Sequence, residues 1–154
     1  MATTSTNNIM KEGTVLEYPT TKTGSVDFNQ GDLVYSNSGV ATVCASDANA
    51  HTLIGIARLA SPMDPTPYGD SVYPDYAEVD YGGVYWMKTT ASETYVHSTS
   101  VSFGADAQTV TTVAGTYAVG VCYLPDGSTV TGASGVKVPV RIWNRSITGL
   151  APLI

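Results

Sequence analysis

Apolar and polar positions along this chain alternate in short runs instead of helical stripes. From Thr14 onward, β-branched and aromatic residues form brief segments separated by Gly, Pro, Asn, Asp and Ser. Segments of this kind are typical of β-strands. The pattern predicts strands at Thr14–Tyr18, Leu33–Ser36, Val40–Ala45, Thr52–Leu59, Val84–Thr89, Thr94–His97, Thr109–Val113, Thr116–Leu124 and Val136–Trp143.

The last segment alternates most clearly. Its apolar positions share one face of the predicted strand and the intervening residues share the other: Val136, Val138, Val140 and Ile142 against Lys137, Pro139, Arg141 and Trp143. This is the pattern of a half-buried strand. Pro139 cannot donate a ladder hydrogen bond, so it predicts an edge strand or an unpaired position.

Tight turns are predicted at Asn37-Ser-Gly39 and Pro125-Asp-Gly127, where glycine supplies a positive φ. Helical spacing of apolar residues is not sustained over three turns anywhere, and the best candidate is a single turn at Ser46–Asn49. We therefore expect an all-β fold, either a small barrel or a sandwich.

An internal repeat aligns Thr52–Leu59 with Tyr117–Leu124 and places Gly55 and Gly120 in mid-strand. An interior glycine marks a bulge or a close approach of two backbones, either of which helps a barrel to curve. The alternative, that these glycines admit a ligand, stays open.

Three further segments complete the expected organisation. Residues 1–12 are small and polar and predict a flexible N-terminal arm, and 147–154 form an apolar C-terminal tail beyond a single β-domain at 13–146. Within that domain, 61–83 contains four Pro, four Tyr and no Lys or Arg. The proline content predicts a long surface excursion.

Composition excludes several classes of protein. Seven Lys and Arg against 13 Asp and Glu give a net charge of −6, which argues against binding to phosphate backbones of nucleic acid. No apolar run approaches the ~20 residues that span a bilayer. The first residues lack the cationic start and apolar stretch of a signal peptide, so we expect synthesis in a cytoplasm that keeps thiols reduced.

The residues give little support to catalysis or metal binding. His51 and His97 lie in no catalytic motif and are interpreted as a turn and a strand residue. Cys44 and Cys122 are interpreted as buried hydrophobes, although pairing between them stays open. The spacing of His, Cys and acidic residues matches no zinc or calcium site. We expect no cofactor, no metal and no enzymatic activity.

Two sets of residues are candidates for contact with partners. The arm and the strand after it suit addition to an exposed sheet edge on another chain, with contacts from Ile9, Met10, Val15, Leu16 and Tyr18. Aromatic residues in and after the excursion form the second set: Tyr68, Tyr73, Tyr76 and Trp86. They fit attachment of the excursion to the barrel, a protein–protein contact, or stacking on sugars.

Four motifs follow one another along the chain: Gly31-Asp-Leu-Val34, Ile54-Gly-Ile-Ala57, Val119-Gly-Val121 and Val138-Pro-Val-Arg-Ile-Trp-Asn144. In this order, over about residues 13–144, the chain resembles the capsid decoration proteins of tailed phages. The 61–83 excursion is longer and more aromatic than the family pattern.

The resemblance implies a structural virion protein on the outer surface of an icosahedral head, made in the host cytoplasm. It implies that the protein cements major capsid subunits, with a homotrimer as the expected assembly and a terminal arm paired to capsid strands. The alternative from the residues is a carbohydrate- or receptor-binding β-module of a virion appendage, which the aromatic excursion favours. A small hydrolase using His51 or His97 is the third hypothesis.

Overall fold

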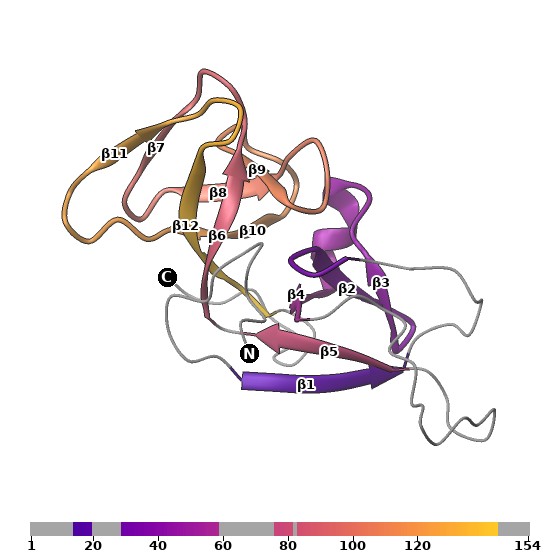
Figure 1. Cartoon of the computed structure of the whole chain (residues 1–154). Helices are drawn as coiled ribbons and strands as arrows, with labels where there is room; N and C mark the ends of the chain where they lie inside the picture. The colour runs from indigo at the N-terminus through magenta and orange to yellow at the C-terminus, as the bar shows by residue number, and fades with distance from the viewer. Residues whose placement is uncertain (1–13, 20–28, 59–75, 82, 145–154) are drawn as a thin grey trace.

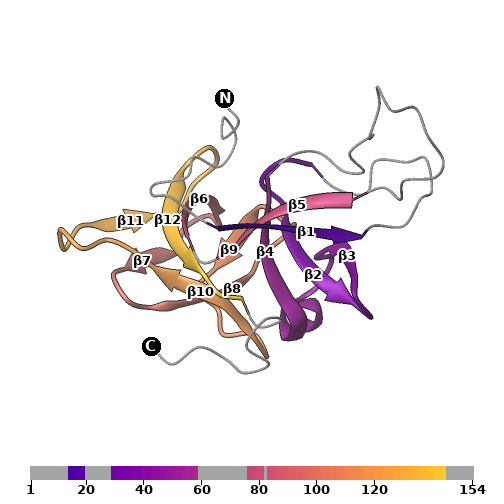
Figure 2. The same cartoon turned by 90° about the horizontal axis from the view of Figure 1, so that it is seen from below.

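The computed structural model describes residues 14–19, 29–58, 76–81 and 83–144. They form a five-stranded sheet, a closed five-stranded barrel and a two-stranded ribbon (Figure 1). This confirms the all-β fold class expected from the sequence. The ribbon lies at one end of the molecule and the β2–β3 hairpin at the other in both views (Figure 2).

The five-stranded sheet has the order β1-β5-β4-β2-β3, and all of its pairs are antiparallel. Its strands are β1 (Thr14–Pro19), β2 (Leu33–Asn37), β3 (Val40–Val43), β4 (Leu53–Ala57) and β5 (Tyr76–Tyr81). The predicted turn at Asn37–Gly39 joins β2 to β3, with φ of 53° at Ser38 and 87° at Gly39. Two positive φ values match the twist of a tight hairpin.

The barrel closes in the order β10-β12-β6-β9-β8. Its strands are β6 (Val84–Thr89), β8 (Ser100–Phe103), β9 (Thr109–Thr111), β10 (Ala118–Cys122) and β12 (Lys137–Ile142). β6 and β9 are parallel, and every other pair is antiparallel. The ribbon pairs β7 (Thr94–Val96) with β11 (Thr129–Thr131).

Pro139 lies on a strand with neighbours on both sides, so of the two predicted alternatives the edge strand is wrong, whereas the unpaired position agrees with the β10–β12 register. β12 lies between β10 and β6, and Pro139 stands opposite Trp86. The β10–β12 register stops at the pair Cys122–Val140, so the ladder does not require the N–H that Pro139 lacks. The Pro139 carbonyl still accepts a hydrogen bond from the Tyr123 N–H at 2.8 Å. The predicted alternation holds, since Val138, Val140 and Ile142 all enter the core.

The internal repeat corresponds to two strands with the same irregularity. In β4, Val34 pairs with Gly55 and Tyr35 with Leu53, so Ile54 is an extra residue. In β10, Ala118 pairs with Ser102 and Gly120 with Val101, so Val119 is extra. A Cβ at Gly120 would collide with the Arg141 carbonyl oxygen, which confirms a close backbone approach there.

The apolar interior is divided into two clusters. The larger one fills the barrel and extends to one face of the sheet, where it includes Leu33, Leu53 and Ile56. The smaller one lies around Val34, Ile54, Ala57 and Val79. Neighbouring residues of β2 and β4 thus enter different clusters, as the side-chain alternation of strands requires. Cys44 and Cys122 are both free, buried thiols in the larger cluster.

One part of the expected excursion is a strand, and the prediction of a surface loop is wrong there. β5 occupies 76–81 and lies between β1 and β4 in the sheet, and Val79 and Asp80 are buried. The four prolines at 62, 65, 67 and 74 all precede it, so proline content averaged over 61–83 concealed a strand. Residues 61–75 lie outside the described residues, as do the predicted arm 1–12 and tail 147–154.

The other differences are small. β8 and β11 were not predicted, because Ser- and Thr-rich segments of three or four residues resemble loops. The single helical turn is the 3-10 helix η1 (Asp47–Thr52), close to its predicted position. The Asn49 side chain fixes its start by accepting from the Ala45 and Ser46 N–H groups at 2.8 and 3.1 Å.

The end of β12 joins barrel and sheet. The Trp143 N–H donates to the Val119 carbonyl at 3.0 Å, and the buried Asn144 side-chain amide donates to the Ile54 carbonyl at 2.6 Å. These two acceptors are the extra residues of the two bulges. Trp143 and Asn144 together therefore connect the equivalent irregularities of both halves of the molecule.

The ribbon is anchored by Glu93. Its carboxylate accepts from the Thr111 hydroxyl at 2.6 Å, from the Thr112 N–H at 2.6 Å and from the Thr112 hydroxyl at 3.1 Å. The buried Tyr95 hydroxyl lies 3.1 Å from the same carboxylate and also accepts from the Thr90 N–H. Desolvation alone would raise the pKa of Glu93, but these hydrogen bonds outweigh it and lower the pKa.

The bond between Asn144 and Ile54 predicts a large cost of replacing the amide. Asn144→Asp should lower the free energy of unfolding by about 2 kcal/mol or more, because a buried carbonyl loses its donor and faces a carboxylate. Asn37→Asp, in the exposed β2–β3 turn, should change it by less than about 0.5 kcal/mol. Urea denaturation of both variants measures this, and equal losses would contradict the assigned role.

The contacts of Glu93 predict an acid-dependent contribution to stability. Because the pKa is lowered on folding, the contribution is complete above the unfolded value of 4.5 and is lost as the pH falls through the folded value. Glu93→Gln should therefore be less stable than the native chain near neutral pH, and the difference should shrink in acid. A difference that is constant from neutral pH to pH 3 (about one and a half units below the ordinary value) would argue against it.

Candidate functional site

The predicted strand contacts lie on an edge strand. Val15, Leu16 and Tyr18 belong to β1, where they stand opposite Asp80, Val79 and Ala77 of β5. β1 ends the sheet order, so within the described residues no strand pairs with its outer edge. The sheet curls so that β1 also contacts β3, the strand at the other end of the order, without pairing to it. An unpaired edge of this kind can bind a strand of another chain. Ile9 and Met10 lie outside the described residues.

The predicted aromatic residues do not form one patch. Tyr68 and Tyr73 lie outside the described residues. Tyr76 is the first residue of β5, opposite Pro19 of β1, whereas Trp86 belongs to the barrel strand β6. Tyr76 and Trp86 are therefore on different sheets.

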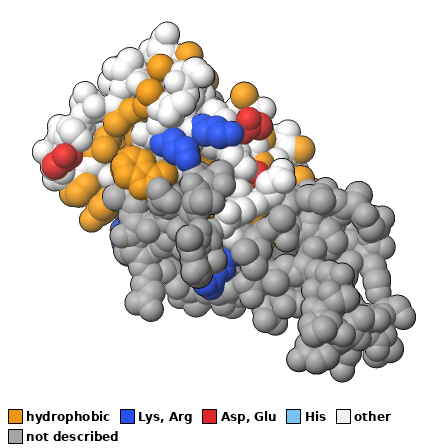
Figure 3. All heavy atoms as spheres, viewed as in Figure 1, with side chains coloured by type: hydrophobic (Ala, Val, Ile, Leu, Met, Phe, Trp, Pro, Cys, Tyr) orange, Lys and Arg blue, Asp and Glu red, His pale blue; other side chains and the backbone are white. Residues whose placement is uncertain are grey.

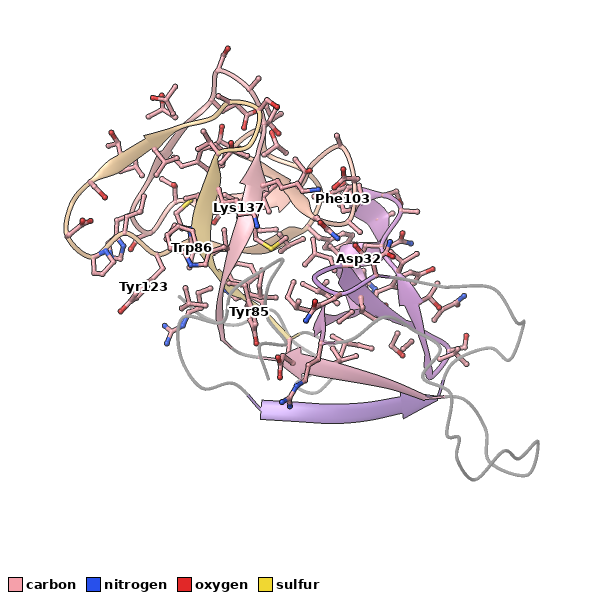
Figure 4. The ribbon with its side chains drawn as sticks, in the orientation of Figure 1. Asp32, Tyr85, Trp86, Phe103, Tyr123 and Lys137 are labelled. Carbon is pink, nitrogen blue, oxygen red and sulfur yellow. The ribbon has the colours of Figure 1, made fainter. Side chains whose placement is uncertain are left out.

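Trp86 instead belongs to a row across the outer wall of the barrel. It is partly exposed and stands opposite Pro139, whose carbonyl accepts from the Tyr123 N–H. Tyr123 is 38 % exposed, and its ring meets His97 edge-on at 5.9 Å. Figure 4 shows Trp86 and Tyr123 on the same side of the barrel. Tyr123 was not among the predicted site residues, although the alternation of strand side chains places it on the face opposite the buried Cys122.

Basic residues gather on this wall. Three of the four described Lys and Arg residues lie there: Lys88 on β6, and Lys137 and Arg141 on β12. Lys88 and Lys137 are directly opposite each other in the strand register. Figure 3 shows basic side chains adjacent to one another on this side, next to a strip of hydrophobic ones. In a chain of net charge −6, this cationic wall is a local excess of positive charge, with an acidic side chain beside it in Figure 3.

A cavity of about 470 Å³ lies between the sheet and the barrel. It is lined by residues of both parts: Asn29, Asp32, Val43, Cys44, Ala45, Lys88, Phe103, Ala105, Asp106, Ala107 and Gln108. Asp32 is buried and accepts from the Gln108 side chain at 2.9 Å and from the Asn29 N–H at 2.8 Å. Asp106 accepts from the Gln108 N–H and the Thr109 hydroxyl. The bond from Gln108 to Asp32 connects the two parts across the cavity, and the other three are local bonds that hold Asp32 and Asp106 in place.

Cys44, in the same cavity lining, is an unreactive thiol. Desolvation, together with the charge of Asp32, raises its pKa to about 12. Burial likewise raises the pKa of Cys122. Because the thiolate is the nucleophile, neither group is activated for chemistry.

The two histidines make local contacts. His97 Nδ1 accepts from the Leu124 N–H at 2.9 Å, and His51 is exposed with its ring 5.0 Å from that of Tyr117. In the part of the chain that the structure describes, no three His, Cys, Asp or Glu side chains are grouped to hold a metal ion. Over the same residues, no helix has the length and hydropathy to cross a membrane.

The sequence was also compared with known proteins. It matches no protein-family model and no curated protein.

Proposed function

We propose that this chain is a structural virion protein that binds the outer surface of an icosahedral phage head and cements major capsid subunits. One support is the ordered set of motifs found in the sequence. Hydrogen bonds link three of these motifs to one another near the junction of sheet and barrel. Asp32 and Ala57 of the first two motifs are connected through Ala57 N–H at 2.9 Å, and Asn144 of the last binds Ile54 of the second. Motifs that are shared because proteins have the same fold are expected to make structural contacts of this kind.

The observation that carries the proposal is the edge strand β1. It begins directly after the predicted arm, so the arm and β1 are continuous in sequence. An edge strand with an apolar extension can add to a strand of another protein, in which backbone hydrogen bonds give affinity and side chains give specificity. We propose the major capsid protein as that partner.

A homotrimer is the proposed binding unit. Ordering an arm on its target costs conformational entropy, which weakens a single contact. Three arms on one particle raise the effective concentration of each other, and so strengthen attachment without new contacts. The mass of the particle in solution measures the assembly.

Binding to undecorated, expanded heads tests the proposal. We expect saturable binding at symmetric positions, seen by sedimentation and electron microscopy. Deleting residues 1–12, or replacing Ile9 and Met10 with Ser, should weaken binding about tenfold or more without changing thermal unfolding, since apolar contacts are lost. Exchanging Ser5 for Thr and Thr6 for Ser is the matched control and should bind normally.

Two outcomes would contradict different parts of the proposal. No binding of the full chain to heads, or absence of the chain from intact virions, would overturn the cement function. Unchanged affinity of the arm variants, with normal binding of the full chain, would overturn the arm alone.

A carbohydrate- or receptor-binding module is the second candidate function, favoured by Trp86 and Tyr123 on the barrel wall. Flat aromatic rings with polar atoms suit stacking on sugars. On a glycan array, this function predicts binding that Trp86→Ala and Tyr123→Ala abolish. Val113→Ala, which changes an exposed apolar residue elsewhere, should retain binding. An array without signal would count against this function.

A further inference from the structure

A second cavity, of about 320 Å³, opens beside the cationic wall. It is lined by β6, β9, the start of β12 and the turn before it: Lys88, Thr89, Thr109, Ala133, Ser134, Gly135, Val136 and Lys137. Its volume is near the lower limit for small-molecule sites. Among these described residues there are two lysines and no carboxylate.

The two lysines are the unusual feature. Lys88 and Lys137 stand directly opposite each other on antiparallel strands, where like charges destabilise a sheet. Lys137 lies next to Trp86 on the viewer's side of the barrel (Figure 4). Both lysines line this cavity, so an anion inside it lies near two positively charged side chains and is attracted by each of them.

The opposite side of the cavity is formed by the Ala133–Val136 turn, which contains backbone N–H groups. The Val136 N–H donates to the Ala133 carbonyl at 3.1 Å and closes the turn, and Gly135 has φ of 79°. Ser134 and Gly135 are the two central residues of the turn, so their N–H groups do not take part in the hydrogen bond that closes it. Backbone N–H groups in turns are common ligands of anions.

The turn is also held rigidly in place. The Thr89 hydroxyl donates to the Val136 carbonyl at 3.1 Å and accepts from the Ala133 N–H at 3.2 Å. Gly132, just before the turn, donates to the Glu93 carbonyl at 2.7 Å, and a Cβ there would collide with the Thr90 carbonyl oxygen. A cavity whose walls are fixed before binding loses little entropy when a ligand enters.

The larger cavity provides the contrast. Lys88 lines both cavities, but the larger one contains Asp32 and Asp106. Negative charge therefore disfavours an anion on that side of Lys88. The smaller cavity is the side on which Lys88 and Lys137 act together.

We propose that this smaller cavity, between Lys88, Lys137 and the Ala133–Val136 turn, binds a small oxyanion group: phosphate, sulfate or carboxylate. The group is either a free ion or part of a larger molecule. The inference does not depend on the capsid function proposed above, since it needs only the barrel.

Thermal unfolding and calorimetric titration of the full chain test the site. At constant ionic strength, low-millimolar phosphate or sulfate in place of chloride should raise Tm, because a ligand of the native state stabilises it. Lys88→Met and Lys137→Met should weaken the affinity about tenfold or more. Arg141→Met removes a cation from the same strand outside the cavity and should bind as the native chain does.

A second readout compares how much the anion raises Tm in each variant. The rise in Tm from chloride to sulfate should be smaller in Lys88→Met and Lys137→Met than in the native chain, and Arg141→Met should keep the native rise. Sulfate stabilises many proteins by exclusion from their surfaces, and such a general effect would appear equally in all variants.

The source of the group is distinguished by three probes: inorganic sulfate, a sulfated oligosaccharide and a tetraglutamate peptide. Whichever binds most tightly, with loss in Lys137→Met, supports the site and identifies the source. No anion-specific shift in the native chain, or an equal loss in Arg141→Met, would overturn the proposal.

Discussion

The extra residue that β4 and β10 each insert before a glycine determines which side chains enter the core. Ile54 and Val119 are those residues, and both are fully buried. Because strand faces alternate with a period of two, an insertion of one residue exchanges the faces beyond it. Ile56 and Cys122 thereby reach the larger cluster. The same insertions present the carbonyls that the end of β12 binds, so core composition and the junction of sheet and barrel share one origin.

Charged side chains are distributed unevenly over the fold. The buried Asp80 lies in the five-stranded sheet and the buried Asp32 directly precedes β2, whereas lysine and arginine lie on the outer wall formed by β6 and β12. The proposed capsid contact at β1 and the proposed oxyanion site at Lys137 therefore lie on different parts of the fold. One relies on backbone pairing and the other on charge, so salt is expected to affect them differently.

The sequence predicted the fold class, nine of the strands approximately and both tight turns, because each depends on local pattern. It missed β5, since prolines just before the strand dominated the composition of the segment. Among site residues, it placed Val15, Leu16 and Tyr18 on a strand but not at a sheet edge, because edges are set by pairing. The Lys88–Lys137 pair was beyond its reach for the same reason: 49 positions separate two residues that only the register of β6 and β12 brings together.

Closure of the barrel has a consequence for how the protein behaves when concentrated. A closed ring of strands has no edge strand with which another chain can pair. Amyloid-type growth therefore cannot start from the barrel strands β6, β8, β9, β10 and β12 while the ring is intact. Within the described residues, it can start only at the margins of the open sheet and of the ribbon. As long as the ring stays intact, resistance of the described part of the chain to aggregation thus depends on how those few margins are shielded.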